Sequence, residues 1–256
     1  MSNKVSIGVF IPNGAQALDT ACADVLGVMS KEYLSALPPA LRLPHLIALA
    51  PRVDMAYITT PSQGRDIPLT SGMVLRATHD YTDPDVAPGR LDIVIVPGPD
   101  PSSEFEEGAL EWLRRQAGTP GVDVLSICTG ILVCGAAGII DGREASGPRG
   151  LQSEIRRRFP KVRLAGDRYR WVRDGNFWSS GGVTNGNDLM AAYARASSKH
   201  WPSSIVELCL MMTDVGDRDQ VYGQGHGTMM ARFGWLLLKS WVASFFCSAG
   251  GKDKIG

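Results

Sequence analysis

The sequence predicts an α/β three-layer sandwich, in which a mainly parallel sheet is covered by helices on both faces. Strand-like and helix-like segments alternate along the chain, which is typical of this class. Two runs, residues 91–98 and 122–127, are almost continuously apolar, as expected for strands buried on both faces. The 256 residues suffice for a sizeable core, and no repeat or clear linker divides them.

The elements follow from local patterns. β-branched and apolar runs, bounded by proline and glycine, predict strands at residues 5–11, 45–50, 55–60, 91–98 and 122–127. Apolar residues at helical spacing predict helices at residues 18–34, 104–118, 129–140, 150–160, 187–198 and 202–216. Residues 168–182 read as a hairpin with its turn at Asp174, Gly175 and Asn176. We expect one domain over residues 1–228 and an apolar C-terminal extension over residues 229–256.

Charge and cysteine content narrow the function classes. Lys+Arg and Asp+Glu both number 26, so the neutral chain is not expected to bind nucleic acid. The five cysteines form no CxxC pair, which favours a reducing, cytoplasmic setting over a disulfide framework. The first 12 residues do not read as a signal peptide, because their short apolar run ends at Pro12. The histidines and cysteines show no metal-ligand spacing, and no cofactor is expected.

Cys128 is the residue that points to chemistry. It follows the buried strand at residues 122–127 and precedes Thr129, Gly130 and a helix of small and aliphatic residues. Ligands of such sheets bind beyond the carboxyl ends of the strands. A helix N-terminus there is expected to lower the thiol pKa and favour thiolate. The alternative is a buried, inert cysteine, since free cysteine is among the most buried residue types.

The surrounding sequence resembles the ThiJ/PfpI superfamily, whose fold is class I glutamine-amidotransferase-like. "SICTGILVCGAAGIIDGREAS" resembles its nucleophile region, and "IGVFIPNGAQALDTACADVL" resembles its first strand and helix. "LDIVIVPGPDP" and "WVRDGNFWSSGGVTNGNDLMAAYARA" resemble its oxyanion strand and late hairpin. These pieces occur in the family's order over about residues 4–212, and within the family they are most similar to the isonitrile hydratase branch. The resemblance implies a flavodoxin-like sheet and a cysteine nucleophile elbow.

The resemblance also implies roles for individual residues. Cys128 would be the nucleophile, and Asp19 would be a carboxyl close to it that stays protonated and acts as a general acid. The alternative for Asp19 is a helix N-cap. Thr129 would line the pocket with its hydroxyl and amide. Gly98 and Asp100 would contribute with Thr129 to the oxyanion and substrate-binding site.

Two departures from the family pattern bear on the reaction. Pro148 stands about where the family has a histidine, which argues against a Cys-His peptidase. Pro99 follows Gly98 where the family often has a second glycine, and proline has no N–H to donate to an oxyanion. One donor is therefore missing or supplied by Asp100.

The sequence leaves three functions open. The first is a lyase that hydrates an isonitrile to an N-formamide through Cys128. The second is a glyoxalase- or deglycase-like enzyme on reactive dicarbonyls, and the third is a non-catalytic redox or stress sensor. The resemblance implies a homodimer that acts on a small molecule. The apolar segment at residues 233–250 is expected to pack on the domain or on a partner subunit, with membrane-surface attachment as the less favoured alternative.

Overall fold

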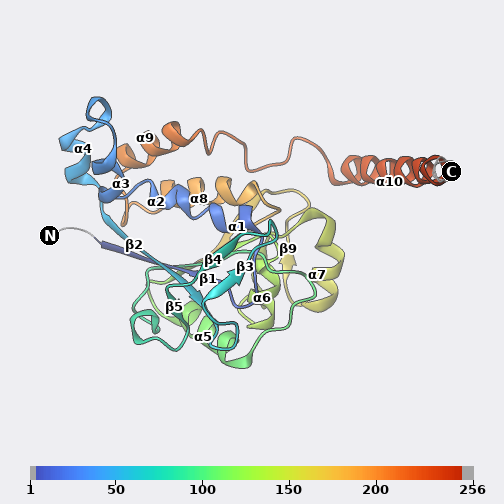
Figure 1. Ribbon diagram of the computed structural model, residues 1–256, viewed down its shortest axis with the longest axis horizontal. Coiled ribbons are helices and arrows are strands. Elements are labelled where there is room, and N and C mark those ends of the chain that lie inside the picture. Colours follow the sequence, from blue (N-terminus) through green and yellow to red (C-terminus); the bar gives the residue numbers. More distant parts are fainter. Residues whose placement is uncertain (1–3, 250–256) are drawn as a thin grey trace, which may run out of the picture.

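A seven-stranded sheet forms the centre of the protein in a computed structural model that describes residues 4–249, with side chains as far as residue 242 (Figure 1). The strand order is β10-β11-β7-β6-β1-β2-β5, and every neighbouring pair is parallel except β10 and β11. The strands are β1 (Lys4–Phe10), β2 (Arg52–Thr59), β5 (His79–Asp80), β6 (Ile93–Val96), β7 (Asp123–Ile127), β10 (Trp171–Asp174) and β11 (Phe177–Ser180). This mainly parallel sheet confirms the predicted fold class.

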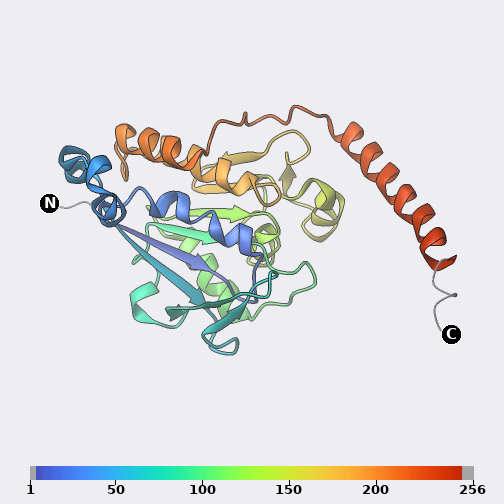
Figure 2. The same ribbon diagram turned by 45° about the horizontal axis from the view of Figure 1, so that its top comes forward.

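Helices cover both faces of the sheet, as Figure 2 shows from a second angle. One layer contains α1 (Ala17–Ala21), α2 (Asp24–Gly27), α8 (Asn185–Ala196) and α9 (Ser203–Thr213). The opposite layer contains α5 (Glu107–Gly118) and α6 (Gly130–Ala136). Each layer therefore encloses its own apolar core against the sheet.

The side chains of the central strands alternate between these two cores. In β6, Ile93 and Ile95 belong to the core under α8 and α9, whereas Val94 and Val96 belong to the core under α5 and α6. All four are fully buried. Because both faces of the strand are covered, every position must be apolar, and this explains the unbroken run in the sequence.

Two predicted elements were wrong. Residues 45–50 form no strand; the segment is helix α4 (Pro44–Leu49), with the proline in its first turn. A short apolar run cannot be assigned from periodicity alone, and proline suits the first position of a helix. The single helix predicted over residues 18–34 is divided into α1, α2 and α3 (Lys31–Ala36), where Ser30 caps α3 by accepting a hydrogen bond from the Tyr33 amide (3.1 Å).

Short elements complete the domain around the sheet. These are β3 (Asp66–Pro68), β4 (Val74–Arg76), β8 (Glu144–Ala145), β9 (Arg163–Leu164), α7 (Gln152–Arg158) and the 3₁₀ turns η1 (Pro39–Leu41), η2 (Pro84–Val86) and η3 (Arg149–Leu151). The loop around η3 lies beside the carboxyl end of the sheet, where Ser146 donates its amide to the Ser179 hydroxyl of β11 (2.8 Å).

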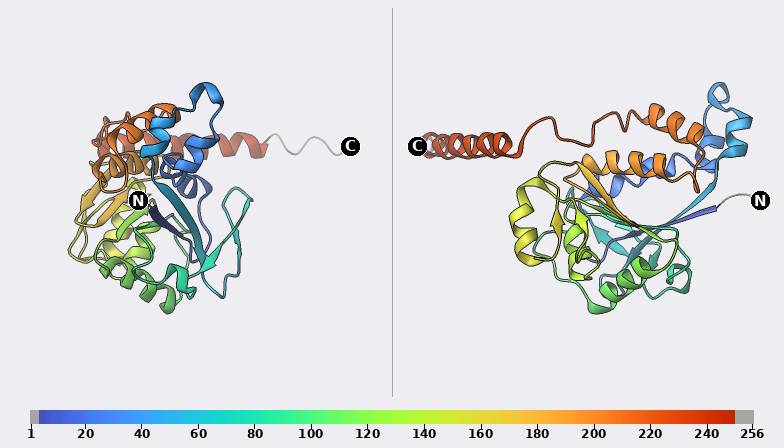
Figure 3. Two further views of the ribbon diagram at one scale, coloured as in Figure 1. Left: turned by 90° about the vertical axis from the view of Figure 1, so that its left-hand side faces the viewer. Right: turned by 180° about the vertical axis from the view of Figure 1, so that it is seen from behind.

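The last helix, α10 (His226–Ala249), extends away from the rest of the domain (Figures 1 and 3). Its described apolar side chains are largely exposed, for example Trp235 at 59% and Trp241 at 60%. The expectation that this segment packs on its own domain was therefore wrong; packing on a partner subunit stays a prediction. Within residues 4–249, no helix is long and apolar enough to cross a membrane.

Candidate active site

Cys128 forms a sharp corner between β7 and α6, as predicted. Its φ angle is 55°, in the left-handed region that side chains rarely adopt, as at the nucleophile elbows of hydrolases. Gly130 permits the turn, because a Cβ there would overlap the Val96 carbonyl of the neighbouring strand β6. The elbow thus holds the thiol at the carboxyl edge of the sheet, 7% exposed.

The electrostatics of Cys128 differ from the expected thiolate. Burial and, to a smaller extent, the negative charge of Asp19 raise the pKa of the thiol to about 11. The backbone amides of Val183 and Thr129 act in the opposite direction. The expected lowering by a helix N-terminus is therefore outweighed, because the short helix α6 acts on a thiol that has lost most of its contact with water.

Asp19 lies inside α1 and is fully buried. The alternative that it caps this helix is wrong, because Gln16 occupies the N-cap position. Burial raises the pKa of Asp19, the Cys128 thiol and the Gly98 amide lower it, and the net value is about 6. Neither carboxyl oxygen has a partner in full hydrogen-bond geometry among the described residues, so these two groups offset burial only in part. The expected protonated state therefore holds only below about pH 6.

Gly98 is the point at which the elements of the site meet. A Cβ on this residue would lie 2.5 Å from Asp19 Oδ2 and 3.0 Å from the Thr129 amide, and it would overlap the Thr129 hydroxyl. Its carbonyl accepts a hydrogen bond from the Gln16 amide (2.9 Å), which holds the start of α1 against the end of β6. The absence of a side chain at Gly98 therefore allows Asp19 and the elbow to approach each other.

Pro99 takes part in the site as an acceptor. Its carbonyl accepts a hydrogen bond from the Thr129 hydroxyl (2.7 Å). This bond holds the hydroxyl in place and uses its only proton. The carboxylate of Asp100 lies in its own exposed turn, where it accepts from the amide (2.8 Å) and hydroxyl (2.5 Å) of Ser102. The Ser102 hydroxyl lowers the pKa of Asp100. Of the predicted residues, the structure thus brings together Cys128, Asp19, Thr129 and Gly98, but not the Asp100 carboxylate.

Val183 was missed in the sequence. It lies in the loop between β11 and α8, has a φ angle of 38°, and directs its amide at the Cys128 thiol. A β-branched residue in the left-handed region is strained, and such strain is concentrated at functional sites. The only signal was the preceding Gly181-Gly182 pair at the end of a predicted strand, which does not reveal which amide faces the thiol.

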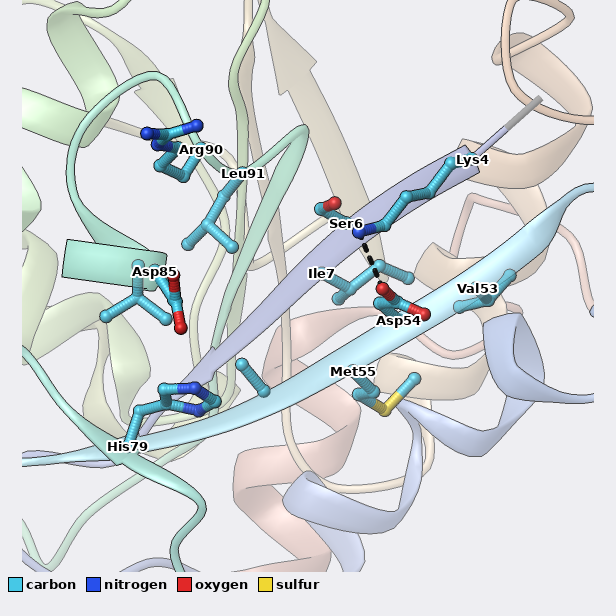
Figure 4. A pocket seen from close by; sticks show the side chains of 12 residues that line it. Lys4, Ser6, Ile7, Val53, Asp54, Met55, His79, Asp85, Arg90 and Leu91 are labelled. Carbon is cyan, nitrogen blue, oxygen red and sulfur yellow. Dashed lines mark ion pairs between the residues drawn. The ribbon is translucent and has the colours of Figure 1, made fainter. Parts of the chain in front are cut away.

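Other features do not compete with this site. A cavity of about 610 Å³ opens over β1 and β2, lined by residues such as Ser6, Met55 and His79, with an ion pair between Lys4 and Asp54 (2.6 Å) (Figure 4). Its lining residues include no cysteine, and they do not pair a nucleophile with a base. In the described part of the chain, no three His, Cys, Asp or Glu side chains are grouped as metal ligands.

The chain is similar in sequence to a curated enzyme. An isonitrile hydratase from Pseudomonas putida is 34% identical over 134 residues. The match covers 50% of this chain and 54% of that enzyme, so the chain spans about half the length of this curated relative.

Solved structures share the fold. A ThiJ/PfpI family protein from Pseudomonas syringae has a TM-score of 0.61 at 16% identity, covering 87% of this chain and 78% of its own. Drosophila melanogaster DJ-1beta also has a TM-score of 0.61 at 16% identity, covering 84% and 99%. The DJ-1/PfpI family model matches residues 46–196, which is more than half of the chain and includes the elbow. The chain therefore belongs to the DJ-1/PfpI family.

Proposed function

We propose that the protein is a cysteine-dependent hydratase that converts an isonitrile into an N-formamide. The observation that carries the proposal is the buried pair of Asp19 and Cys128. The pKa of Asp19, about 6, lies close to neutral pH, so this carboxyl can both accept and return a proton there. The pair supplies a nucleophile and its proton carrier without a histidine. The similarity to an isonitrile hydratase over half of the chain supports the same reaction.

The first half of the reaction forms a carbon–sulfur bond. The thiol of Cys128 loses its proton to the Asp19 carboxylate while sulfur adds to the terminal carbon of the isonitrile. Asp19 then delivers that proton to the same carbon, which gives an S-bound thioimidate, S–CH=N–R. The amides of Val183 and Thr129, which face the sulfur, stabilise the negative charge that passes through it.

The second half releases the product. A water molecule adds to the thioimidate carbon, a proton reaches the nitrogen, and the carbon–sulfur bond breaks. Sulfur leaves as thiolate and regains a proton from Asp19 or water. The net change is addition of one water to the isonitrile, with no oxidation or reduction. The high pKa of the Cys128 thiol means that proton removal must be coupled to attack, and the adjacent Asp19 is suited to this role.

A substrate panel tests the proposal. An aliphatic isonitrile, methylglyoxal and a fluorogenic peptide are each incubated with the wild type and with Cys128→Ala. We expect N-formamide from the isonitrile with the wild type only, and no turnover of the other two. Turnover of methylglyoxal alone would favour the glyoxalase-like alternative. Turnover of no member of the panel would contradict the enzyme.

A further inference from the structure

Two arginines lie over the ring of one tyrosine next to the site. The guanidinium carbon of Arg149 is 4.2 Å from the ring centroid of Tyr222, and that of Arg170 is 4.6 Å from it. Arg149 comes from η3 and Arg170 from the bend directly before β10, while Tyr222 comes from the chain that leads to α10. Three segments far apart in the sequence therefore bring two positive charges together.

Arg149 has no acidic partner among the described residues. One of its Nη atoms donates to the backbone carbonyls of Asp167 (3.2 Å) and Gln224 (3.0 Å). Its Nε is buried and has no hydrogen-bond partner in that part of the chain. A buried guanidinium donor without an acceptor is costly unless a ligand supplies one.

Arg170 likewise forms its hydrogen bonds with neutral groups, although its charge also acts on the nearby Asp188 carboxylate, where it offsets part of the rise in pKa that burial causes. It donates to the backbone carbonyl of Asp219 (3.0 Å) and to the side-chain oxygen of Asn185 (3.4 Å). The neighbouring Arg218, in contrast, forms an ion pair with the buried carboxylate of Asp188 (2.6 Å). Asp188 is thus paired directly with Arg218 and is influenced less by Arg170, and neither Arg149 nor Arg170 forms a direct ion pair with a described carboxylate.

This cluster borders the loop that contacts the nucleophile. Asn185 donates to the Tyr222 hydroxyl (2.8 Å), and a Cβ on Gly181 would lie 2.5 Å from that hydroxyl. Two residues after Gly181, the amide of Val183 faces the Cys128 thiol. The arginines therefore flank the same loop that forms one wall of the candidate site.

We propose that Arg149 and Arg170, positioned by Tyr222, form a carboxylate-binding subsite, so that the substrate of Cys128 is a small electrophile that carries a carboxylate. The planar fork of a guanidinium matches the two oxygens of a carboxylate, and stacking on an aromatic ring restricts its orientation. Positive charge next to the loop that forms one wall of the site also raises the local concentration of anions. The inference rests on the proposed hydratase function and deepens it by naming its substrate class.

The first test uses alkylation and does not depend on turnover. Iodoacetate and iodoacetamide differ mainly in the negative charge, so the ratio of their rates at Cys128 reports attraction of a carboxylate. We expect Arg149→Met and Arg170→Met each to lower this ratio by about fivefold or more. Arg149→Lys and Arg170→Lys retain the positive charge, so they should retain part of the wild-type rate ratio.

Arg173→Met is the matched control. Arg173 also lies over an aromatic ring, that of Trp178 at 5.0 Å, and also donates to a backbone carbonyl, but it belongs to β10 away from the loop. Its substitution should leave the ratio unchanged. An equal ratio in the wild type and both arginine-to-methionine variants would overturn the subsite. Acetate should slow the iodoacetate reaction of the wild type; protection by inorganic phosphate but not by acetate would overturn the carboxylate assignment.

The second test uses turnover of isocyanoacetate and its neutral ethyl ester. We expect kcat/KM to favour isocyanoacetate, and this preference to fall in Arg149→Met and Arg170→Met through a higher KM. A preference for the ester in the wild type would overturn the substrate class. If neither compound is hydrated, the proposed function fails, whereas the alkylation ratios still decide the subsite.

Discussion

At the scale of single residues, the site depends on the proton shared between Asp19 and Cys128. Burial favours the neutral form of both groups, and the negative charge of Asp19 disfavours the thiolate, whereas the Cys128 thiol favours the Asp19 carboxylate through a hydrogen bond. Near neutral pH the pair therefore holds one proton, mainly on sulfur, with the carboxylate beside it ready to accept it. The sequence suggested a preformed thiolate that is activated by the helix N-terminus. In this arrangement the Asp19 carboxylate activates the nucleophile instead, by accepting the thiol proton.

Asp19→Asn should retain the fold and lose most turnover. The amide fills the same space but cannot accept the thiol proton, and general acid–base help is worth about 10²–10⁴ in rate. In the wild type, kcat/KM should fall as pH drops through about 6, because protonated Asp19 can no longer act as the base. Initial rates from pH 5 to 9 check both statements. A variant as active as the wild type would reduce Asp19 to a structural residue.

The same substitution should change stability in a pH-dependent way. The folded-state pKa of Asp19, about 6, lies above its ordinary value of 3.8, so its contribution to stability is most favourable below pH 3.8 and is lost as pH rises through 6. The shift corresponds to about 3 kcal/mol. Relative to the wild type, Asp19→Asn should therefore gain about that much free energy of unfolding between pH 3.5 and 8. Urea titrations across this range measure it; a constant difference would contradict the buried charge.

Cys128 should be alkylated faster than Cys22, Cys134 and Cys209. It is 7% exposed, whereas the other three are at most 1% exposed, and burial raises the pKa of all four thiols. The rate should still rise between pH 8 and 10, because the pKa of Cys128 is about 11. Peptide mapping after limiting iodoacetamide in a Cys247→Ser background tests this. Earlier labelling of Cys209 would argue against an accessible elbow.

At the scale of elements, the site forms where α1, the end of β6 and the β7–α6 corner meet. Gly98 connects them, since its carbonyl binds the start of α1 and its missing side chain leaves room for both Asp19 and Thr129. Backbone and side-chain groups of all three elements therefore approach one another closely at one residue. A substitution at Gly98 should displace these three elements from one another without disturbing the two apolar cores.

Gly98→Ala tests the intersection. A methyl group would lie 2.5 Å from the Asp19 carboxyl and overlap the Thr129 hydroxyl, so both must move. We expect turnover to fall by at least 10²-fold, because a displacement of about 1 Å in an active site can cost that much. Gly182→Ala serves as the control, because a Cβ there meets no atom within 4 Å. If both variants keep full activity, Gly98 does not set the geometry of the site.

The elements also show what the sequence could and could not predict. The run at β6 was recognisable because both faces of the strand are buried, and Cys128 was recognisable because a cysteine ends such a strand. The helix α4 was not recognisable, because its six mostly apolar residues fit a strand or a helix equally well. The positive φ of Val183 was beyond prediction, since it results from tertiary constraints on the loop and not from the preference of valine.

At the scale of the whole molecule, α10 is the helix that does not pack on the folded domain. It extends from the folded body, and its described apolar side chains are about half exposed, including Phe233, Leu236 and Leu237 at 53% to 54%. Contiguous apolar surface of this kind marks an interaction site. The sequence predicted a homodimer from the family resemblance and from its apolar C-terminal segment, and the exposed helix supplies a physical reason to expect self-association.

We therefore expect a dimer of the full chain and a monomer of a chain that ends at residue 225. Removal of α10 should expose no core, because the helix extends from the folded body and its described apolar side chains are exposed, so both proteins should unfold at nearly the same temperature. The truncation also removes the ion pair between His226 and Asp167 (2.9 Å), which lies at the surface. Light scattering at micromolar concentration and calorimetry measure the two properties. Leu237→Glu with Trp241→Glu is the matched variant, since it keeps the helix length and places charges among the exposed apolar side chains. A truncated chain that remains dimeric would place the interface on the folded domain, and a monomeric full chain would contradict the dimer itself.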